Sequence, residues 1–222
     1  LVVHPDPDGV IDVDALFTPE LAAELDSWNF AEMQPDVRLT FDVACNWKLA
    51  IDTFGETYHF PALHLNTINL GFHGNVSVHE KFGRNHRFLL CKRAIDHMRT
   101  LPKDQWDITV AALPAYWLFP NVQLLPTDFG AFLIRMYPDP ENPAHHLSRI
   151  TIWFRPITPG DDGDVEARRE QQRNISQTFT TIIRDEDYVM SASQQVTANS
   201  GILSHVVFGR NEPALHHYHN TY

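Results

Sequence analysis

The sequence predicts an α+β fold in which a curved antiparallel sheet is closed by one long C-terminal helix. Two features of the 222-residue chain carry this prediction. Its middle is filled by segments rich in β-branched and aromatic residues, bounded by Gly, Asn or Pro. From Val165 to about Thr197 there is neither proline nor glycine, and charged and polar residues dominate, which indicates a single long helix, straight or bent.

The composition excludes several classes of protein. Hydrophobic residues make up 43% and charged residues 20%, which is typical of a globular domain that buries a sizeable core. A formal net charge of -11 argues against a general nucleic-acid partner or an anionic membrane surface. No apolar run reaches the roughly 18 residues needed to span a bilayer. Cys45 and Cys91 are too few for a disulfide framework, so we expect a cytoplasmic location.

Residues 1–36 are predicted to be a connector. A strand-like start, LVV, is followed by a Pro/Asp/Gly turn cluster. A short helix is then predicted over TPELAAELDSW, with Thr18 as its N-cap and Pro19 at its first helical position. Because the chain opens on Leu1 in this strand-like way, we expect the connector to continue from a module further upstream.

The main domain is predicted to span residues 37–222 and to open with a strand, because Leu39, Phe41 and Val43 alternate with polar residues. Five later segments are also predicted to form strands: 75–82, 83–94, 115–126, 131–140 and 147–156. In the last of these, alternate apolar residues share one face. They are Ile150, Ile152 and Phe154.

The segment NWKLAIDTFGETYH, residues 46–59, is predicted to be a helix that ends near His59. His64 follows five residues later, and positions five apart lie about 140° apart around a regular helix, so the two imidazoles cannot share one helical face. Pro61 lies between them and disfavours helical geometry at Phe60. We therefore expect the chain to turn after His59, so that His64 faces the same point.

Two imidazoles facing one point suggest a metal site, which needs a further ligand. The long helix offers three acidic residues, Asp185, Glu186 and Asp187. Two histidines and one carboxylate form the facial triad of non-haem Fe(II) oxygenases, although zinc also accepts such ligands. The spacing alone is equally compatible with two unrelated histidines, one at a helix end and one on the surface.

The segment NWKLAIDTFGETYHFPALH resembles the mononuclear-iron motif of the Rieske non-haem iron oxygenases, the ring-hydroxylating oxygenase α-subunits. Asn46, Trp47 and Lys48 match the opening of that motif, and Glu56, Tyr58, His59 and His64 match the remainder. The similarity covers roughly residues 37–222 and implies a helix-grip, START-like catalytic domain.

The resemblance implies a ligand set. In the family both histidines bind iron, and the third ligand is an aspartate in an acidic pair on a C-terminal helix, followed by apolar residues and glutamine. Asp187, preceded by Glu186 and followed by Gln194, fits this description better than Asp185 does. The ending FGRNEPALHHYHNTY resembles the closing helix of the family, so the histidines in it are expected to be ordinary helix residues.

The resemblance also implies how electrons arrive. The family's acidic residue at the position of Glu56 links an iron-bound histidine to a Rieske-cluster histidine on the next subunit, so Glu56 is expected to be the electron bridge of a homotrimer. Electrons would come from NAD(P)H through a reductase or ferredoxin and a [2Fe-2S] centre. That centre needs C-x-H and C-x2-H pairs, which this sequence lacks, so the centre is expected only in an upstream module.

Two residues of the motif depart from the pattern of the family. Thr53 stands where the family usually has Asn, and Glu56 where it often has the shorter Asp. The expected substrate is an aromatic acid or hydrocarbon, or another small organic molecule. Phe119, Leu133 and Trp153 are the candidates for lining its pocket. His145 and His146 are expected at the surface. The alternative function is a metal-free domain of the same shape that binds an apolar small molecule, and a third is zinc-dependent hydrolysis.

Overall fold

A seven-stranded antiparallel sheet lies at the centre of the computed structural model, which describes residues 6–157 and 165–222. Its strands are ordered β1-β7-β6-β5-β4-β3-β2, so the first strand of the chain pairs with the last. The strands are β1 (Gln34–Val43), β2 (Phe72–Phe82), β3 (Asn85–Lys92), β4 (Ala112–Leu118), β5 (Val122–Pro126), β6 (Gly130–Pro138) and β7 (His146–Phe154). The predicted α+β class and antiparallel sheet are confirmed.

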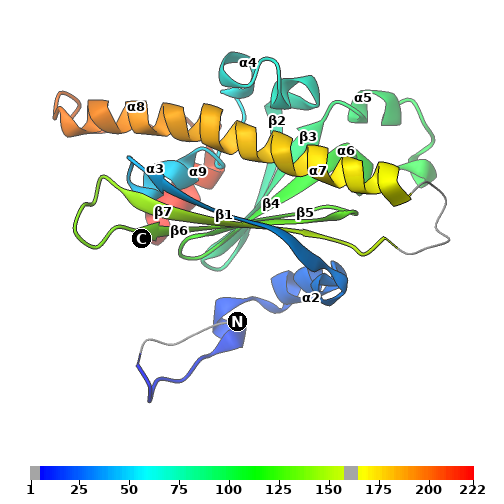
Figure 1. Ribbon diagram of the computed structural model, residues 1–222, viewed down its shortest axis with the longest axis horizontal. Coiled ribbons are helices and arrows are strands. Elements are labelled where there is room, and N and C mark those ends of the chain that lie inside the picture. Colours follow the sequence, from blue (N-terminus) through cyan, green and yellow to red (C-terminus); the bar gives the residue numbers. More distant parts are fainter. Residues whose placement is uncertain (1–5, 158–164) are drawn as a thin grey trace.

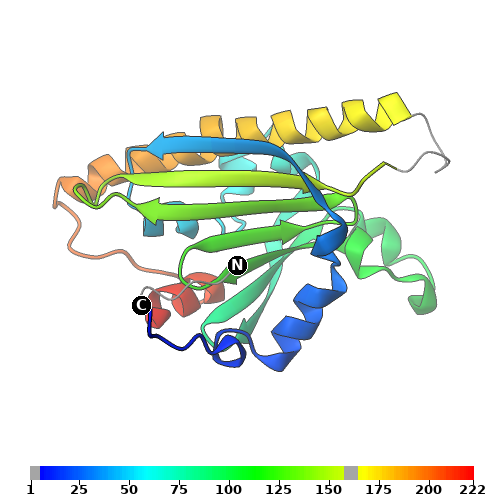
Figure 2. The same cartoon turned by 60° about the horizontal axis from the view of Figure 1, so that its bottom comes forward.

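One continuous helix crosses one face of the sheet (Figure 1). It consists of α7 (Val165–Thr181), a π-helical segment η4 (Ile182–Asp187) and α8 (Tyr188–Asn199). On the opposite face lies α2 (Pro19–Ser27), as Figure 2 shows from below. The remaining helices are α1 (Val13–Leu16), η1 (Phe30–Glu32), α3 (Trp47–Asp52), α4 (Phe60–Leu63), η2 (Ile68–Leu70), α5 (Ile95–Met98), η3 (Lys103–Gln105), α6 (Ile108–Ala111) and α9 (Pro213–Thr221). The long helix predicted from Val165 is confirmed.

Because strand side chains alternate between the two faces of a sheet, each face has its own core. The larger core lies under the long helix and includes the predicted row of Ile150, Ile152 and Phe154, each at most 4% exposed. The smaller core lies under α2 and includes Leu21 and Tyr116. Fully burying side chains of this size contributes roughly 1.5–3 kcal/mol each.

The N-terminal helix forms as predicted. The Thr18 hydroxyl accepts a hydrogen bond from the Leu21 backbone N–H at 3.4 Å, and Pro19 is the first helical residue. Leu21 is completely buried against the sheet. The strand-like start predicted at residues 1–3 lies outside the described residues. Strand β1 begins at Gln34, three residues earlier than predicted, and alternates in burial as predicted.

The prediction of one helix over residues 46–59 is wrong. Helix α3 ends at Asp52, and the chain then turns through Gly55, where an added Cβ would lie 2.3 Å from Cδ2 of Leu215 in α9. This close approach leaves no room for a side chain at position 55, and the contact with α9 is not visible in local sequence. A separate helix, α4, begins at Phe60 and carries Pro61 in its first turn, where the missing N–H costs nothing. Pro61 therefore does not break the chain at this point.

The segment predicted as one strand at 115–126 forms two, β4 and β5, joined by a turn that contains a cis Phe119–Pro120 peptide bond. The other predicted strands occur with shifted ends. In the described part of the chain, no helix is both long enough and apolar enough to cross a membrane.

Candidate metal centre

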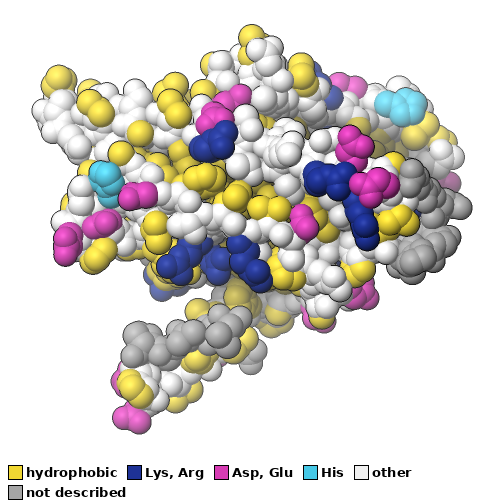
Figure 3. Space-filling view, in the orientation of Figure 1, with side chains coloured by type: hydrophobic (Ala, Val, Ile, Leu, Met, Phe, Trp, Pro, Cys, Tyr) yellow, Lys and Arg dark blue, Asp and Glu magenta, His cyan; other side chains and the backbone are white. Residues whose placement is uncertain are grey.

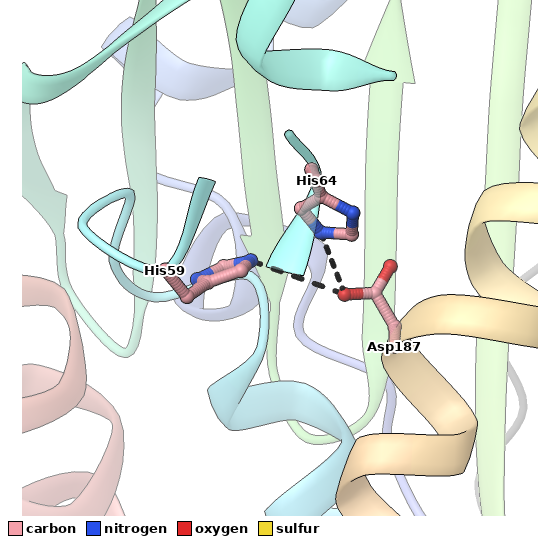
Figure 4. A group of neighbouring side chains, drawn as sticks. All are labelled: His59, His64 and Asp187. Atoms are coloured by element: carbon pink, nitrogen blue, oxygen red, sulfur yellow. Dashed lines mark hydrogen bonds and ion pairs between the residues drawn. The ribbon is translucent and has the colours of Figure 1, made fainter. Parts of the chain in front are cut away.

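Helix α4 is a single turn, and its two ends position the two histidines of the motif. His59 occupies the N-cap position and His64 the C-cap position, where its backbone N–H donates to the Phe60 carbonyl oxygen at 3.0 Å. Because neither histidine lies inside the helix, the 140° separation expected for a regular helix does not apply. Both rings turn toward the long helix (Figure 4).

The π-helical segment η4 supplies the carboxylates. Short π-helical segments inside α-helices are rare and occur frequently at functional sites. Asp187 is the last residue of this segment and is 5% exposed. Glu186 and Asp187 both reach His64, although consecutive residues of a regular α-helix point about 100° apart.

The side chains of His59, His64 and Asp187 converge on one point. Oδ1 of Asp187 lies 3.1 Å from Nε2 of His64 and 3.9 Å from Nε2 of His59 (Figure 4). One ligand atom from each residue lies within 4.8 Å of the others, and no other group of three or more potential ligands meets this criterion among the described residues. The structure thus brings together the three residues that the sequence predicted as ligands.

The other ring nitrogen of each histidine faces a further carboxylate. His59 Nδ1 bonds to Glu56 Oε1, and the His59 backbone N–H donates to Glu56 Oε2 at 3.2 Å. His64 Nδ1 lies 2.5 Å from Glu186 Oε2, which also accepts from the Thr67 hydroxyl at 2.8 Å. With Nδ1 of each ring engaged in this way, Nε2 is left to point at Asp187.

The electrostatics of His64 reflect this crowding of carboxylates. Burial alone would lower the pKa of His64, but the hydrogen bonds and charges of Asp187 and Glu186 outweigh burial and raise it. The carboxylates that favour the protonated form of His64 would likewise stabilise a metal cation bound at this point.

The donor set fits a mononuclear metal ion. Two imidazole nitrogens and one carboxylate oxygen are the ligands of the facial triad, which leaves other positions open. Metal–ligand distances of about 2.0–2.1 Å place neighbouring donors about 3 Å apart. The observed separations of 3.1 and 3.9 Å need only a small closure around an ion.

A cavity of about 610 Å³ adjoins the three residues, between the sheet and the long helix. Most of its lining is apolar. The apolar lining comes from five strands, from the long helix and from segments next to the histidines, and it includes Phe60, Leu113, Phe132 and Phe179. The rings of Phe132 and Phe179 stack with centroids 4.3 Å apart, which joins β6 to α7 at the cavity wall.

The three predicted pocket residues, Phe119, Leu133 and Trp153, do not line this cavity, so that prediction is wrong. Leu133 and Trp153 pack in the smaller core under α2, on the opposite face of the sheet. Leu133 follows Phe132 on β6, and adjacent strand residues point to opposite faces. Phe119 lies at the end of β4, against the guanidinium of Arg84.

The structure also places the other acidic and histidine residues that the sequence analysis considered. Asp185 is exposed and pairs with Arg184 at 2.6 Å, so it points away from the histidines. His146 is 1% exposed and bonds to the Cys45 carbonyl oxygen at 2.8 Å, so its predicted surface position is wrong. The histidines near the C-terminus lie in α9 as predicted.

Two contacts at the site were not predicted from the sequence. Glu186 was considered as a possible ligand but not as a partner of His64 Nδ1, and Thr67 was not singled out. The position of Thr67 three residues after His64 is the signal that could have indicated a contact. Which face of η4 carries Glu186, however, depends on the π-helical segment, which has no clear sequence signature.

Comparisons with known proteins agree with the geometry. Residues 30–222 match the protein family described as "Ring hydroxylating alpha subunit (catalytic domain)". No curated protein matches the sequence.

Solved structures with the same fold include a quaternary ammonium Rieske monooxygenase linked to carnitine oxidation by gut microbiota, with a TM-score of 0.73 and 15% identity over 96% of this chain and 56% of that one. A naphthalene 1,2-dioxygenase variant bound to phenanthrene matches with a TM-score of 0.62 and 11% identity, over 97% and 60% of the two chains. Dicamba monooxygenase matches with a TM-score of 0.54 and 11% identity, over 97% and 62%. The present chain thus spans a little over half the length of these proteins.

Proposed function

Because the chain belongs to the family of ring-hydroxylating oxygenase α-subunit catalytic domains, and is thus the catalytic domain of a Rieske non-haem iron oxygenase, we propose that His59, His64 and Asp187 bind its mononuclear Fe(II) ion. The observation that carries this proposal is the convergence of the two Nε2 atoms and Oδ1 on one point. When bound, the iron would activate O₂ for insertion into a small organic substrate.

The residues of this chain have distinct parts in that reaction. His59, His64 and Asp187 would hold the ion from one side, which leaves the cavity side open. Glu56 and Glu186 orient the two imidazoles through Nδ1. The apolar lining positions the substrate body next to the ligands and excludes water from it.

Glu56 is proposed to have a second part, as the route by which electrons reach the site. Its carboxylate contacts His59 directly, its side chain is 11% exposed, and the neighbouring Tyr58 is 54% exposed. Glu56 is therefore not fully enclosed, and in this proposal a group on another subunit approaches it from the side of Tyr58. In this proposal electrons come from NAD(P)H through a reductase or ferredoxin and a [2Fe-2S] centre of the next subunit in a homotrimer. A connector over residues 1–36 that leads from that module stays a prediction.

Metal analysis of matched variants tests the ligand set. The protein is reconstituted anaerobically with Fe(II), desalted and analysed for bound metal. We expect about one iron per wild-type chain, loss of tight binding in Asp187→Asn, and retention in Asp185→Asn, which removes an exposed carboxylate of the same helical segment.

Two results would contradict the proposal. Full iron content in Asp187→Asn would show that Asp187 is not a ligand. A wild-type protein that binds no iron but binds an apolar molecule would indicate the metal-free binding domain instead, and one that retains only zinc and hydrolyses a substrate would indicate a hydrolase.

A further inference from the structure

The charged side chains that line the cavity are all acidic. Among the described residues, Glu56, Glu170 and Asp187 contribute to its lining, and no lysine or arginine does. Glu56 and Asp187 lie at the histidines, whereas Glu170 lies on the exposed rim formed by α7. Glu56 and Asp187 already pair with the histidines, and Glu170 faces solvent, so among the described residues the interior of the cavity offers neither a free carboxylate to a cation nor a lysine or arginine to an anion.

Two arginines of helix α7, Arg169 and Arg173, lie outside the cavity. Ala167, Glu170, Gln171, Asn174 and Thr178 line the cavity, and their spacing of three and four residues places them on one helical face. The adjacent residues Arg169, Gln172 and Arg173 instead line a separate depression, together with Gln34, Asp36 and Arg155. Figure 3 shows Lys and Arg side chains gathered on this front surface, near the N-terminal half of α7. Arg169 and Arg173 are thus adjacent in sequence to residues that line the cavity, but they lie on a different face of the helix.

The deeper wall of the cavity is aromatic and aliphatic. Five phenylalanines contribute to it: Phe54, Phe60, Phe72, Phe132 and Phe179. A cavity of this size lies within the range of about 300–1,000 Å³ for small-molecule sites. Away from the histidines, the lining thus removes apolar surface of a ligand from water, and it offers hydrogen bonds at its rim from residues such as Gln171, Asn174 and Thr178.

An anionic ligand would meet two penalties here. A carboxylate in the phenylalanine-lined part would lose water without gaining a lysine or arginine partner, and unpaired buried charge is strongly disfavoured. It would also lie near carboxylates of the same sign. Sites that bind carboxylates typically supply an arginine whose planar guanidinium makes two parallel hydrogen bonds, and this lining has none among the described residues.

We infer that the domain selects an uncharged, predominantly apolar substrate and rejects anionic ones. The apolar body occupies the phenylalanine-lined part beside His59 and His64, and any hydroxyl or amide group of the substrate lies at the rim of α7. The charge preference excludes the aromatic acids from the expected substrates and leaves the hydrocarbons and other uncharged compounds. The inference rests on the proposed function only for the position of the reacting carbon, since the charge preference concerns binding.

Binding of shape-matched compounds tests the inference. Calorimetry under anaerobic conditions, on the Fe(II)-reconstituted protein, compares the hydroxymethyl, carboxylate and aminomethyl derivatives of benzene, naphthalene and biphenyl at pH 7.5. For the ring system that binds best, we expect the carboxylate to bind at least about tenfold more weakly than the alcohol, and the ammonium compound to bind no more tightly than the alcohol. A carboxylate that binds as tightly as the alcohol overturns the inference, and so does an ammonium compound that binds tenfold more tightly. Failure of every neutral compound to bind also overturns it.

A pair of adjacent variants separates the lining from the general charge of the protein. Gln171→Arg adds a cation on the cavity face of α7, whereas Gln172→Arg adds the same charge on the other face. We expect Gln171→Arg to improve carboxylate binding about tenfold relative to the alcohol, and Gln172→Arg to leave the ratio unchanged. Equal effects of both variants would refute the role assigned to the lining.

The same experiment distinguishes the two proposals. If the protein binds no iron but keeps the preference for neutral compounds, the proposed oxygenase site fails and the inference stands. If iron binds to His59, His64 and Asp187 but the carboxylates bind best, the site stands and the inference fails.

Discussion

Replacement of Glu186 by Gln is expected to weaken metal binding, although Glu186 is not one of the three proposed metal ligands. Glu186 Oε2 lies 2.5 Å from His64 Nδ1, and the Thr67 hydroxyl donates to the same oxygen at 2.8 Å. A hydrogen bond to a charged group contributes about 1.5–3 kcal/mol, against about 0.5–1.5 kcal/mol for a neutral one. Because glutamine keeps the shape but loses the charge, Glu186→Gln should cost about 1–2 kcal/mol, or roughly 5- to 30-fold in metal affinity.

The affinity is best measured by anaerobic competition between the protein and a chelator for Fe(II). The absorption spectrum of the Co(II)-loaded protein gives a second readout, because Co(II) bands respond to ligand geometry and not to the overall stability of the fold. Asp185→Asn is the matched control, since it removes an adjacent carboxylate that is exposed and paired with Arg184. We expect this control to bind Fe(II) and Co(II) like the wild type.

Thr67→Val tests whether Thr67 acts through Glu186. Because Glu186 keeps its charge and its hydrogen bond to His64 in this variant, we expect a smaller decrease in affinity, of about 2- to 10-fold. Contacting residues are not additive, so Thr67→Val should add little in the Glu186→Gln background. Unchanged affinity and an unchanged Co(II) spectrum in Glu186→Gln, or fully additive effects in the double variant, would refute the contact chain from Thr67 through Glu186 to His64.

Three further predictions concern electron supply, acid stability and packing. In the full-length enzyme, Glu56→Gln should slow the NAD(P)H-driven reaction much more than a peroxide-driven one, and equal losses would make Glu56 only an orienting residue. Burial, reinforced by the nearby histidines and Lys81, lowers the pKa of His86 to about 2. The unfolded chain takes up a proton on this histidine below about pH 6.5, but the folded chain does not. The contribution of His86 to stability should therefore fall by about 1.4 kcal/mol per pH unit below that pH. Urea titrations at pH 6.5 and 4.5 should show a shallower loss in His86→Phe, and the same steep loss in a control variant of the exposed His205. Gly130→Ala should lower stability by about 1–3 kcal/mol, because its Cβ would lie 2.1 Å from the Trp153 carbonyl oxygen, whereas Gly71→Ala, with 3.8 Å to its nearest neighbour, should cost less in thermal unfolding.

Local sequence determined much of the architecture. Apolar residues alternate with polar ones up to Val43 and around Ile150, and this pattern predicted strands with one face in the core. The prediction was possible because side chains of any strand point to opposite faces in turn. The N-cap at Thr18 and the uninterrupted polar stretch from Val165 predicted helices for the same reason, since caps and helix breakers act within one turn. The motif ending in His59 and His64 pointed to a metal site and, through its resemblance, to the family.

Tertiary structure decided the features that depend on two distant segments. In the turn that follows helix α3, Gly55 lies against Leu215, which is 160 residues later in the sequence. The pocket residues were mispredicted because the face on which a strand residue lies follows from its register with its neighbours, which places Phe132 in the cavity and Leu133 under α2. The contact of Glu186 with His64 joins the π-helical segment to a histidine 122 residues earlier in the sequence. Periodicity and capping act over a few residues and can be read in sequence, whereas contacts between segments exist only once both are packed.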